Sequence, residues 1–235
     1  THDFIVTYYG DDKYDKSTVN GNITVNKKAA TLIVEDLVKY YKGDEKLTAK
    51  LVDGMGNPIS DADVVFNING KDYIRKTNNE GIASIAINLG AGTYKVVVKY
   101  NESSVNVSVT VKSTVLADDL VKMYKNATKF SAKFTDSTGK ALVNSDVRFN
   151  INGVFYTRIT NSEGVATLNI NLLPGEYIIT NYNLVTGEEN SNKVTVKSLL
   201  IDKSNLVKYY LNGSKYTLKV IGKDGKIAAG QEVTF

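Results

Sequence analysis

The sequence predicts an all-β protein made of two-layer β-sandwich domains in tandem, arranged as an elongated rod. Three features of the 235 residues predict this fold: a repeat longer than 80 residues, an alternation of apolar and polar residues, and glycine-containing turns between the alternating segments. A period of two is typical of strands that bury one face, whereas no segment keeps a helical period beyond two turns. The fold class is therefore all-β.

A tandem repeat sets the domain organisation. The segment Leu37–Tyr41 recurs as Leu120–Tyr124, 83 residues further on (120 minus 37), and again as Leu206–Tyr210, after another 86 residues (206 minus 120). The strongest match joins Phe66–Leu89 to Phe149–Leu172, which share 15 of 24 residues. Such a long period indicates separate domains, each with its own core, rather than the stacked units of a solenoid.

The repeats divide the chain into four predicted domains or parts of domains. Residues 1–30 match the end of a repeat, residues 31–114 and 115–198 form two whole repeats, and residues 199–235 match the beginning of another. The half repeats predict that the chain belongs to a longer array. Complementation of the two halves between neighbouring subunits is the alternative.

Each whole repeat predicts a series of short antiparallel strands. In the second repeat, Phe130, Ala132 and Phe134 alternate with polar residues, and a turn follows at residues 136–139. Asn152-Gly153 favours a two-residue hairpin turn, because both central positions of a type I′ turn need positive φ. The other inward positions that we predict are Val147, Phe149, Ile151, Ala83, Ile85, Ile87, Leu89, Ala166, Leu168, Ile170, Leu172, Val105, Val107, Val109 and Val111.

Seven or so short strands with turns every 8–12 residues are typical of an Ig-like sandwich. Tyr94 and Tyr177 begin the penultimate strand of each repeat, where a tyrosine corner bonds its hydroxyl to nearby backbone. The chain has no Cys and no Trp, so these would not be antibody-type domains.

Composition excludes several function classes. Without Cys there is no disulfide framework, thiolate nucleophile or Cys-ligated zinc, and the single His2 provides no catalytic triad or His-rich metal site. The 29 basic and 25 acidic residues give a net charge of +4 and are interspersed, whereas a nucleic-acid binder concentrates its cations. Apolar runs of about seven residues are too short to span a membrane, and no signal peptide is recognised. We therefore expect no enzyme, no cofactor, no nucleic-acid partner and no membrane span.

Several motifs resemble known surface proteins. The pattern Asn-Gly, Tyr, Arg, Thr-Asn, Glu-Gly and Gly-x-Tyr resembles bacterial Ig-like domains of the invasin and intimin class. The segment Tyr8–Tyr14 resembles a Tyr-x-Gly-Asp-x-x-Tyr motif of large surface proteins, and the Leu-Val-Lys-Tyr-Tyr and Phe-Asn-Ile-Asn-Gly runs resemble adhesin-like proteins of methanogenic archaea. The resemblance covers the whole chain. It implies a cell-surface location and an adhesion or spacer role, and no catalytic residue.

Two sets of repeated charged residues were candidates for a site. Arg75 and Arg158 share one repeat position, and Glu80 and Glu163 lie five residues further on; a structural Arg–Glu pair is the favoured interpretation. An intramolecular Lys–Asn bond is the second hypothesis, and it requires a buried, neutral amine beside a protonated carboxyl group. Its candidate residues are Lys50, Lys133 and Lys219 with Asn101 or Asn183; Lys133 alternates out of phase with the core and should face solvent.

Acidic residues in the predicted linkers raise the question of calcium, which prefers several carboxylate and carbonyl oxygens. They are Glu35, Asp36, Asp118, Asp119 and Asp202, and a further group consists of Asp11, Asp12 and Asp15. Solvated charge at a domain junction, and a polar loop for the last group, are the favoured interpretations. We expect no metal site.

Five Asn-x-Ser/Thr triplets are candidate glycosylation sites if the protein is exported. They start at Asn22, Asn101, Asn106, Asn126 and Asn212. Asn126 and Asn212 share one repeat position in a predicted turn and are favoured. The 15 Tyr residues fit half-buried strands, and the pairs Tyr40-Tyr41 and Tyr209-Tyr210 are expected in core or interdomain packing rather than stacked on sugar.

The sequence thus predicts a segment of an extracellular cell-surface adhesin-like protein that acts as a stalk or spacer and mediates adhesion. Linkers without Gly or Pro, at Val111–Ala117 and Val196–Leu200, favour limited bending between units. A carbohydrate- or protein-binding module, which should carry an aromatic patch in one unit only, is the alternative. A filament assembled by strand complementation, and a non-catalytic region of a longer enzyme, are others. The predicted partners are other cell surfaces, glycans or neighbouring copies of the chain.

Overall fold

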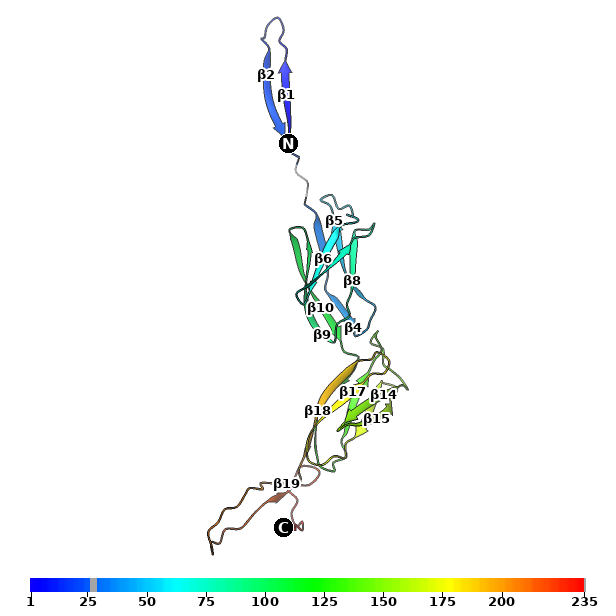
Figure 1. Cartoon of the computed structure of the whole chain (residues 1–235), viewed down its shortest axis with the longest axis vertical. Helices are drawn as coiled ribbons and strands as arrows, with labels where there is room; N and C mark the ends of the chain where they lie inside the picture. Colours follow the sequence, from blue (N-terminus) through cyan, green and yellow to red (C-terminus); the bar gives the residue numbers. More distant parts are fainter. Residues whose placement is uncertain (26–28, 235) are drawn as a thin grey trace. The chain divides into compact units, whose positions relative to one another are not determined.

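The computed structural model describes residues 1–25 and 29–234 (Figure 1). The predicted domains 1–30 and 199–235 include residues 26–28 and 235, which lie outside the described residues. Throughout the described chain, the regular secondary structure consists of β-strands and no helix. The prediction of an all-β protein with tandem β-sandwiches is therefore confirmed.

The first whole repeat contains eight strands in two sheets. One sheet has the order β3-β5-β8 and the other the order β4-β10-β9-β6-β7. The strands are β3 (Thr31–Val34), β4 (Leu37–Tyr40), β5 (Lys46–Val52), β6 (Asp63–Ile68), β7 (Lys71–Lys76), β8 (Ile82–Ala86), β9 (Gly92–Tyr100) and β10 (Ser103–Lys112).

The second repeat has the same arrangement. Its sheets have the orders β11-β13-β16 and β12-β18-β17-β14-β15. The strands are β11 (Val115–Ala117), β12 (Leu120–Met123), β13 (Lys129–Phe134), β14 (Asp146–Ile151), β15 (Val154–Ile159), β16 (Val165–Asn169), β17 (Gly175–Tyr182) and β18 (Glu189–Lys197). The two repeats therefore have the same strand order, as the recurring sequence pattern predicts.

Shorter elements precede and follow the two repeats. β1 (His2–Tyr8) and β2 (Ser17–Ile23) form an antiparallel hairpin, and β19 (Leu200–Ile201) pairs with β20 (Lys219–Val220). The third copy of the repeated motif, Leu206–Tyr210, lies outside the strands. The corresponding strands of the two whole repeats, β4 and β12, pair with β10 and β18. Among the described residues, no strand pairs with Leu206–Tyr210 in the same way.

The first strand of each repeat is divided between the two sheets. In the second repeat, β11 pairs antiparallel with β13, whereas β12 pairs parallel with β18, with Leu120 opposite Val194. Asp118 and Asp119 connect the two halves. Because this short segment belongs to both layers, it closes one edge of the sandwich.

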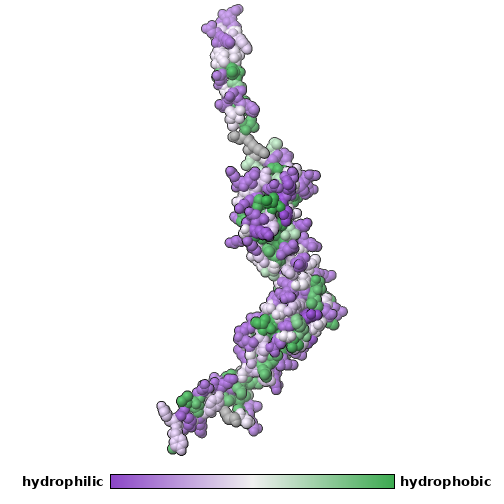
Figure 2. All heavy atoms as spheres, in the orientation of Figure 1, coloured by the Kyte–Doolittle hydropathy of each residue, from purple (hydrophilic) through white to green (hydrophobic). Residues whose placement is uncertain are grey.

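The cores follow the predicted alternation. In the second repeat, Phe130 and Phe134 from one sheet meet Phe149 from the other, at ring-centroid distances of 5.9 and 6.0 Å. The equivalent interior of the first repeat contains Leu47, Phe66 and Val98, all buried. Of the predicted inward positions, Leu89, Leu172 and Val105 are half-buried rather than buried, since they lie near strand ends. On the face that Figure 2 shows, hydrophilic residues cover much of the surface, with smaller hydrophobic areas between them.

Turn chemistry also follows the sequence. Asn152 and Gly153 have φ values of 53° and 77°, and Asn69 and Gly70 have 52° and 79°, as a type I′ turn requires. At Gly164, φ is 78° and an added Cβ would lie 2.6 Å from the Phe134 carbonyl oxygen, so only glycine fits this corner. The Tyr177 hydroxyl donates to the Leu173 carbonyl at 2.8 Å, which confirms the tyrosine corner there.

Two compact units are distinguished along the chain. One comprises Thr1–Leu37, Lys46–Ala86 and Tyr94–Ser108, and the other Val38–Glu45, Ile87–Thr93 and Val109–Phe235. The predicted domain boundaries at residues 30, 114 and 198 stay a prediction.

Candidate functional site

Two of the predicted linker acids, Asp36 and Asp119, bind backbone. Asp36 and Asp119 lie where the first strand changes sheet, and each carboxylate accepts a hydrogen bond from a neighbouring strand: from Ser108 N at 2.7 Å and from Lys193 N at 2.8 Å. Asp202 instead forms an ion pair with Lys219 at 2.6 Å. Asp36 and Asp119 share one repeat position because each strand switch leaves a backbone N–H group of the neighbouring strand that needs an acceptor.

The other acidic candidates do not gather either. Asp11 accepts hydrogen bonds from the backbone of Lys13 and Tyr14, both at 2.9 Å, which makes it a turn residue. The hydrogen bond from Lys13, and then that from the Tyr8 hydroxyl, lower the pKa of Asp11. Within residues 1–25 and 29–234, no group of three or more His, Asp or Glu residues is placed to hold a metal ion.

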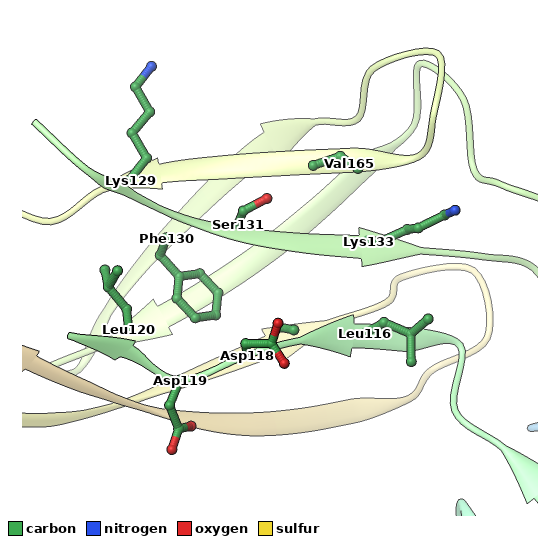
Figure 3. Close-up of a pocket in the computed structure, with 10 residues that line it drawn as sticks. Leu116, Asp118, Asp119, Leu120, Lys129, Phe130, Ser131, Lys133 and Val165 are labelled. Atoms are coloured by element: carbon green, nitrogen blue, oxygen red, sulfur yellow. The ribbon is translucent and has the colours of Figure 1, made fainter. Parts of the chain in front are cut away.

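An open depression of about 430 Å³ lies on the second repeat (Figure 3). Phe130 and Leu120 point into it, and Asp118, Lys129 and Lys133 lie at its rim. A carboxylate and two solvated amines at separate edges supply no nucleophile paired with a base. The depression is the gap left where the first strand changes sheet.

Sequence reasoning missed a pair of buried lysines. Lys39 and Lys122, the Lys of each Leu-Val-Lys motif, are only 3% and 5% exposed. The Lys122 amine donates to the carbonyl oxygens of Ile170 and Thr128, both at 3.0 Å. Its burial lowers its pKa. The signal was present in the sequence, because this Lys is in phase with Leu120 in the alternating pattern.

Lys39 occupies the same place in the first repeat. Its amine donates to the Ile87 carbonyl at 3.0 Å and to the Gly43 carbonyl at 2.5 Å. In both repeats the amine therefore links the half-strand β4 or β12 to the end of a strand in the opposite sheet. We call this contact the lysine clamp (Lys39 or Lys122 with its two carbonyl oxygens).

The candidate lysines do not have the surroundings that the hypothesis of a Lys–Asn cross-link requires. Lys50 and Lys133 are exposed, as expected for Lys133. Lys219 is exposed and paired with Asp202, which raises the pKa of its amine. Asn101 lies in an exposed turn. A solvated, protonated amine is not the nucleophile that this chemistry needs, so the hypothesis is wrong for these lysines.

Asn183, the other cross-link candidate, belongs to a buried polar cluster in the second repeat. Its side-chain amide donates to the Thr135 carbonyl at 2.8 Å and to the Thr114 carbonyl at 3.2 Å. The carboxylate of Glu188, 7% exposed, accepts from the Thr114 backbone N–H at 2.5 Å and from its hydroxyl at 2.6 Å. The cluster holds the β17–β18 loop against the start of the repeat. At the equivalent place the first repeat keeps a threonine, Thr31, but has Tyr100 in place of Asn183 and a shorter turn between β9 and β10.

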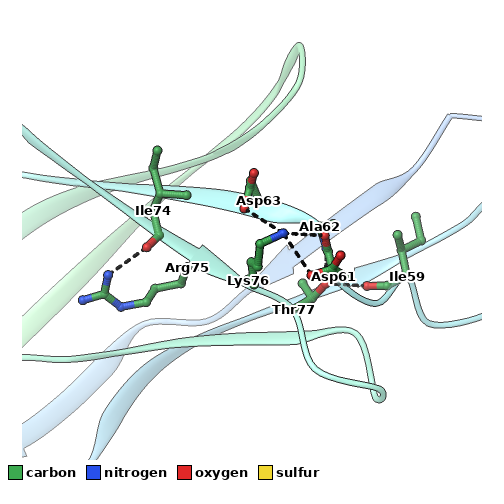
Figure 4. Close-up of polar contacts among 8 residues, drawn as sticks. All are labelled: Ile59, Asp61, Ala62, Asp63, Ile74, Arg75, Lys76 and Thr77. Carbon is green, nitrogen blue, oxygen red and sulfur yellow. Dashed lines mark hydrogen bonds and ion pairs between the residues drawn. The ribbon is translucent and has the colours of Figure 1, made fainter.

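The repeated Arg and Glu residues do not pair with each other. Arg75 is opposite Val64 in the β6–β7 register, and its guanidinium donates to the carbonyl oxygen of its neighbour Ile74 at 2.7 Å (Figure 4). Arg158 donates to Thr157 O at 2.7 Å and lies over the Tyr156 ring. No ion pair of either Arg with Glu80 or Glu163 is present among the described residues, and both guanidinium groups bind backbone instead; the structural role of these residues stays a prediction.

Charge pairing at this edge instead involves Lys76. Its amine lies 2.9 Å from Asp61 and 3.6 Å from Asp63 (Figure 4), and the hydrogen bond with Asp61 raises its pKa. The buried Thr77 hydroxyl donates to Ile59 O at 2.7 Å and thereby fixes the loop before β6. All these contacts are structural.

The predicted glycosylation residues are accessible to different degrees. Asn22 and Asn106 are exposed within β2 and β10, Asn101 is exposed in a turn, and Asn212 is exposed. Asn126 is half-buried, and its side-chain oxygen accepts from Thr128 N at 2.7 Å and from the Thr128 hydroxyl at 2.5 Å. The Ser214 N–H and hydroxyl bond to Asn212 in the same way. Glycosylation stays a prediction at all five.

Comparisons with known proteins do not assign a family. No known family matches the sequence, and no curated protein matches it either. No helix in the described part of the chain is long and apolar enough to cross a membrane.

Similar solved structures exist, at low similarity. An ice-binding, calcium-stabilised adhesin of an Antarctic bacterium matches with 17% identity over 83% of this chain and 56% of that chain (TM-score 0.30). The adhesin InvE of Yersinia pseudotuberculosis matches with 18% identity over 71% of this chain and 58% of that chain (TM-score 0.28). Invasin, a bacterial integrin-binding protein, matches with 18% identity over 87% of this chain and 48% of that chain (TM-score 0.32). The chain thus spans little more than half the length of the first two structures.

Proposed function

We propose that the chain is a segment of an extracellular cell-surface protein of the adhesin-like type, which acts as a stalk or spacer between the cell and a surface to which it adheres. One observation carries this proposal: two consecutive repeats each close their own hydrophobic core with the same strand order. Independent cores in tandem lengthen a chain without adding chemistry.

The contacts at the strand switch support a load-bearing role. The parallel pair β12–β18 joins the first and last strands of the second repeat. Force applied to the two ends of a repeat would therefore shear these strands against each other. The lysine clamp ties β12 to the opposite sheet at this place, so shearing must break backbone pairing and the clamp together.

Single-molecule stretching of the whole chain between two handles tests the mechanical part. Residues 31–112 and 115–197 should unfold in two separate events, each releasing roughly 270 Å of extended chain, from about 3.3–3.6 Å per residue. The Lys122→Met variant should lower the force of one event only, and Lys133→Met, on an exposed residue, should lower neither. A single event, or unfolding without measurable force, contradicts the stalk.

Antibody labelling of cells of the source organism tests the location. Antibodies raised against residues 31–197 should label intact cells. Labelling that appears only after the cells are broken contradicts an extracellular position. Sedimentation of the purified chain tests the filament alternative, since strand complementation between copies would give species larger than the monomer.

A further inference from the structure

One face of the second repeat differs in chemistry from the same face of the first. The sheet β12-β18-β17-β14-β15 has an outer side whose residues are fixed by register: Arg148 lies opposite Thr157 and Tyr182, and Asn150 lies opposite Phe155 and Thr180. Paired residues of neighbouring strands project to the same side of a sheet. These six residues therefore form one contiguous area on three adjacent strands.

Two aromatic rings lean together over this area. The ring centroids of Phe155 and Tyr182 are 5.8 Å apart at an interplanar angle of 51°, and the Arg148 guanidinium lies 5.6 Å from the centre of the Phe155 ring. Phe155 is nevertheless 56% exposed. We call Arg148, Asn150, Phe155 and Tyr182 the aromatic platform.

The first repeat shares only the asparagine of these four residues. Its equivalent positions are Val65, Asn67, Asp72 and Lys99. There the Asn67 side-chain amide donates to the Asp72 carboxylate at 2.5 Å. In the second repeat Phe155 replaces that carboxylate, and the described contacts include no side-chain hydrogen bond of Asn150. The fold therefore does not require the exposed ring, and the Asn150 amide lacks the carboxylate partner that Asn67 has.

The charges around the platform favour an uncharged occupant. Asp146, two residues before Arg148 on the same side of β14, and Glu189, opposite Tyr182, place two carboxylates near the single guanidinium. Lys193, on the same face, is already paired with Glu176 at 2.8 Å. An anionic ligand would meet more negative than unpaired positive charge, so a neutral ligand is expected.

The size of the platform limits its partner. Thr157 and Thr180 separate it from the exposed side chains of Ile159 and Ile178, so the apolar area is broken by hydroxyl groups. A stable protein–protein interface needs about 800 Å² on each partner with an apolar centre, far more than two rings provide. A small ligand with one apolar face and a polar rim fits better.

We propose that the aromatic platform binds a neutral sugar ring of a glycan. A pyranose presents C–H groups on its faces, which pack against exposed aromatic rings, and hydroxyl groups around its edge. The Asn150 amide offers donors and an acceptor, and the Arg148 guanidinium offers a fork of donors, both at the border of the rings. This binding role goes beyond the stalk function and does not depend on it.

Titration of the whole chain with neutral trisaccharides tests the proposal. The probes are cellotriose, mannotriose, galactotriose and chitotriose, observed by saturation-transfer NMR and by tyrosine fluorescence. At least one should bind, with transfer from aromatic protons. Phe155→Asp, which installs the first-repeat residue, and Tyr182→Ala should each weaken binding by about tenfold or more, as the loss of a central aromatic contact does. Thermal unfolding should show that both variants remain folded.

The first repeat provides the matched control. Asp72→Ala and Lys99→Ala should leave binding unchanged, and the triple variant Val65→Arg, Asp72→Phe, Lys99→Tyr should raise the number of binding sites from one to two. Binding of none of the four sugars, or binding that Phe155→Asp leaves intact, overturns the proposal. So does a loss of self-association in the Phe155→Asp variant on sedimentation, because the face would then be an interface between copies.

Discussion

Replacing Lys122 with methionine would test the lysine clamp directly. The substitution keeps a long apolar stem in the same space and removes the amine that serves the Ile170 and Thr128 carbonyl oxygens. A buried acceptor without a donor costs about 1–3 kcal/mol. The Ile170 carbonyl would bear this cost, whereas water can reach the partly buried Thr128 carbonyl.

The net magnitude follows from two opposing terms. Burial lowers the pKa of the Lys122 amine, so the charge itself is unfavourable in the folded state and its removal returns part of the cost. We therefore expect a loss of about 1–2 kcal/mol in the free energy of unfolding of the second repeat. For a domain of this size, that loss corresponds to a midpoint lower by about 4–16 °C.

Urea and thermal unfolding, followed by circular dichroism, would measure the effect. Two repeats with separate cores should give two transitions, of which Lys122→Met shifts one and Lys39→Met shifts the other. Lys133→Met should shift neither by more than about 0.5 kcal/mol, because Lys133 is exposed. Unchanged stability of Lys122→Met, or an equal shift of both transitions, would refute the clamp.

The same lysine gives a pH dependence of known sign. Since its folded pKa lies below the ordinary 10.5, the unfolded chain holds more protons between the two values, and stability rises as the pH increases through that window. Lys122→Met should abolish this rise. Lys76 has the opposite sign: its pKa is raised by Asp61, so its contribution is complete below 10.5 and is lost as the pH rises through the folded value.

Three further substitutions probe other buried contacts. Glu188→Ala leaves the Thr114 N–H and hydroxyl without their acceptor and should cost the second repeat about 2–4 kcal/mol by urea unfolding; a loss below 0.5 kcal/mol would mean that water replaces the carboxylate. Tyr177→Phe removes only the hydroxyl bonded to Leu173 O and should cost about 0.5–1.5 kcal/mol, with no change in the circular dichroism spectrum. Asp119→Ala frees the Lys193 N–H and should lower the thermal midpoint of the second repeat, whereas Asp118→Ala should not; equal effects would contradict the assignment of Asp119.

The fold was predictable because its determinants are local and repeated. Alternation placed Phe130, Phe134 and Phe149 in the core, and the Asn152-Gly153 turn fixed the β14–β15 register that sets Asn150 opposite Phe155. A register set by a two-residue turn leaves one pairing, so the faces of both strands follow from the sequence.

The contacts that depend on the third dimension were not predictable. Alternation places Lys122 in phase with Leu120, but the sequence does not show that the Ile170 and Thr128 carbonyl oxygens receive its amine. Asp119 reads as a linker charge until the strand switch places it beside Lys193 N. Arg75 and Glu80 recur together in the sequence, yet the Arg75 guanidinium binds the Ile74 carbonyl, because spacing along a chain does not show which backbone oxygen lies nearest.

A comparison of the two repeats distinguishes the residues that stabilise the fold from those that differ on its surface. Both repeats keep the buried lysine and the strand-switch acid, which satisfy backbone groups, and the turn glycines, which adopt positive φ. They diverge on the outer face of the larger sheet, where Asp72 and Lys99 in one copy correspond to Phe155 and Tyr182 in the other. An exposed Phe gives the fold little, since more than half of its surface remains in water. Our proposal gives this residue a role in binding a sugar, and the outer face of the second repeat is therefore where binding should first be sought.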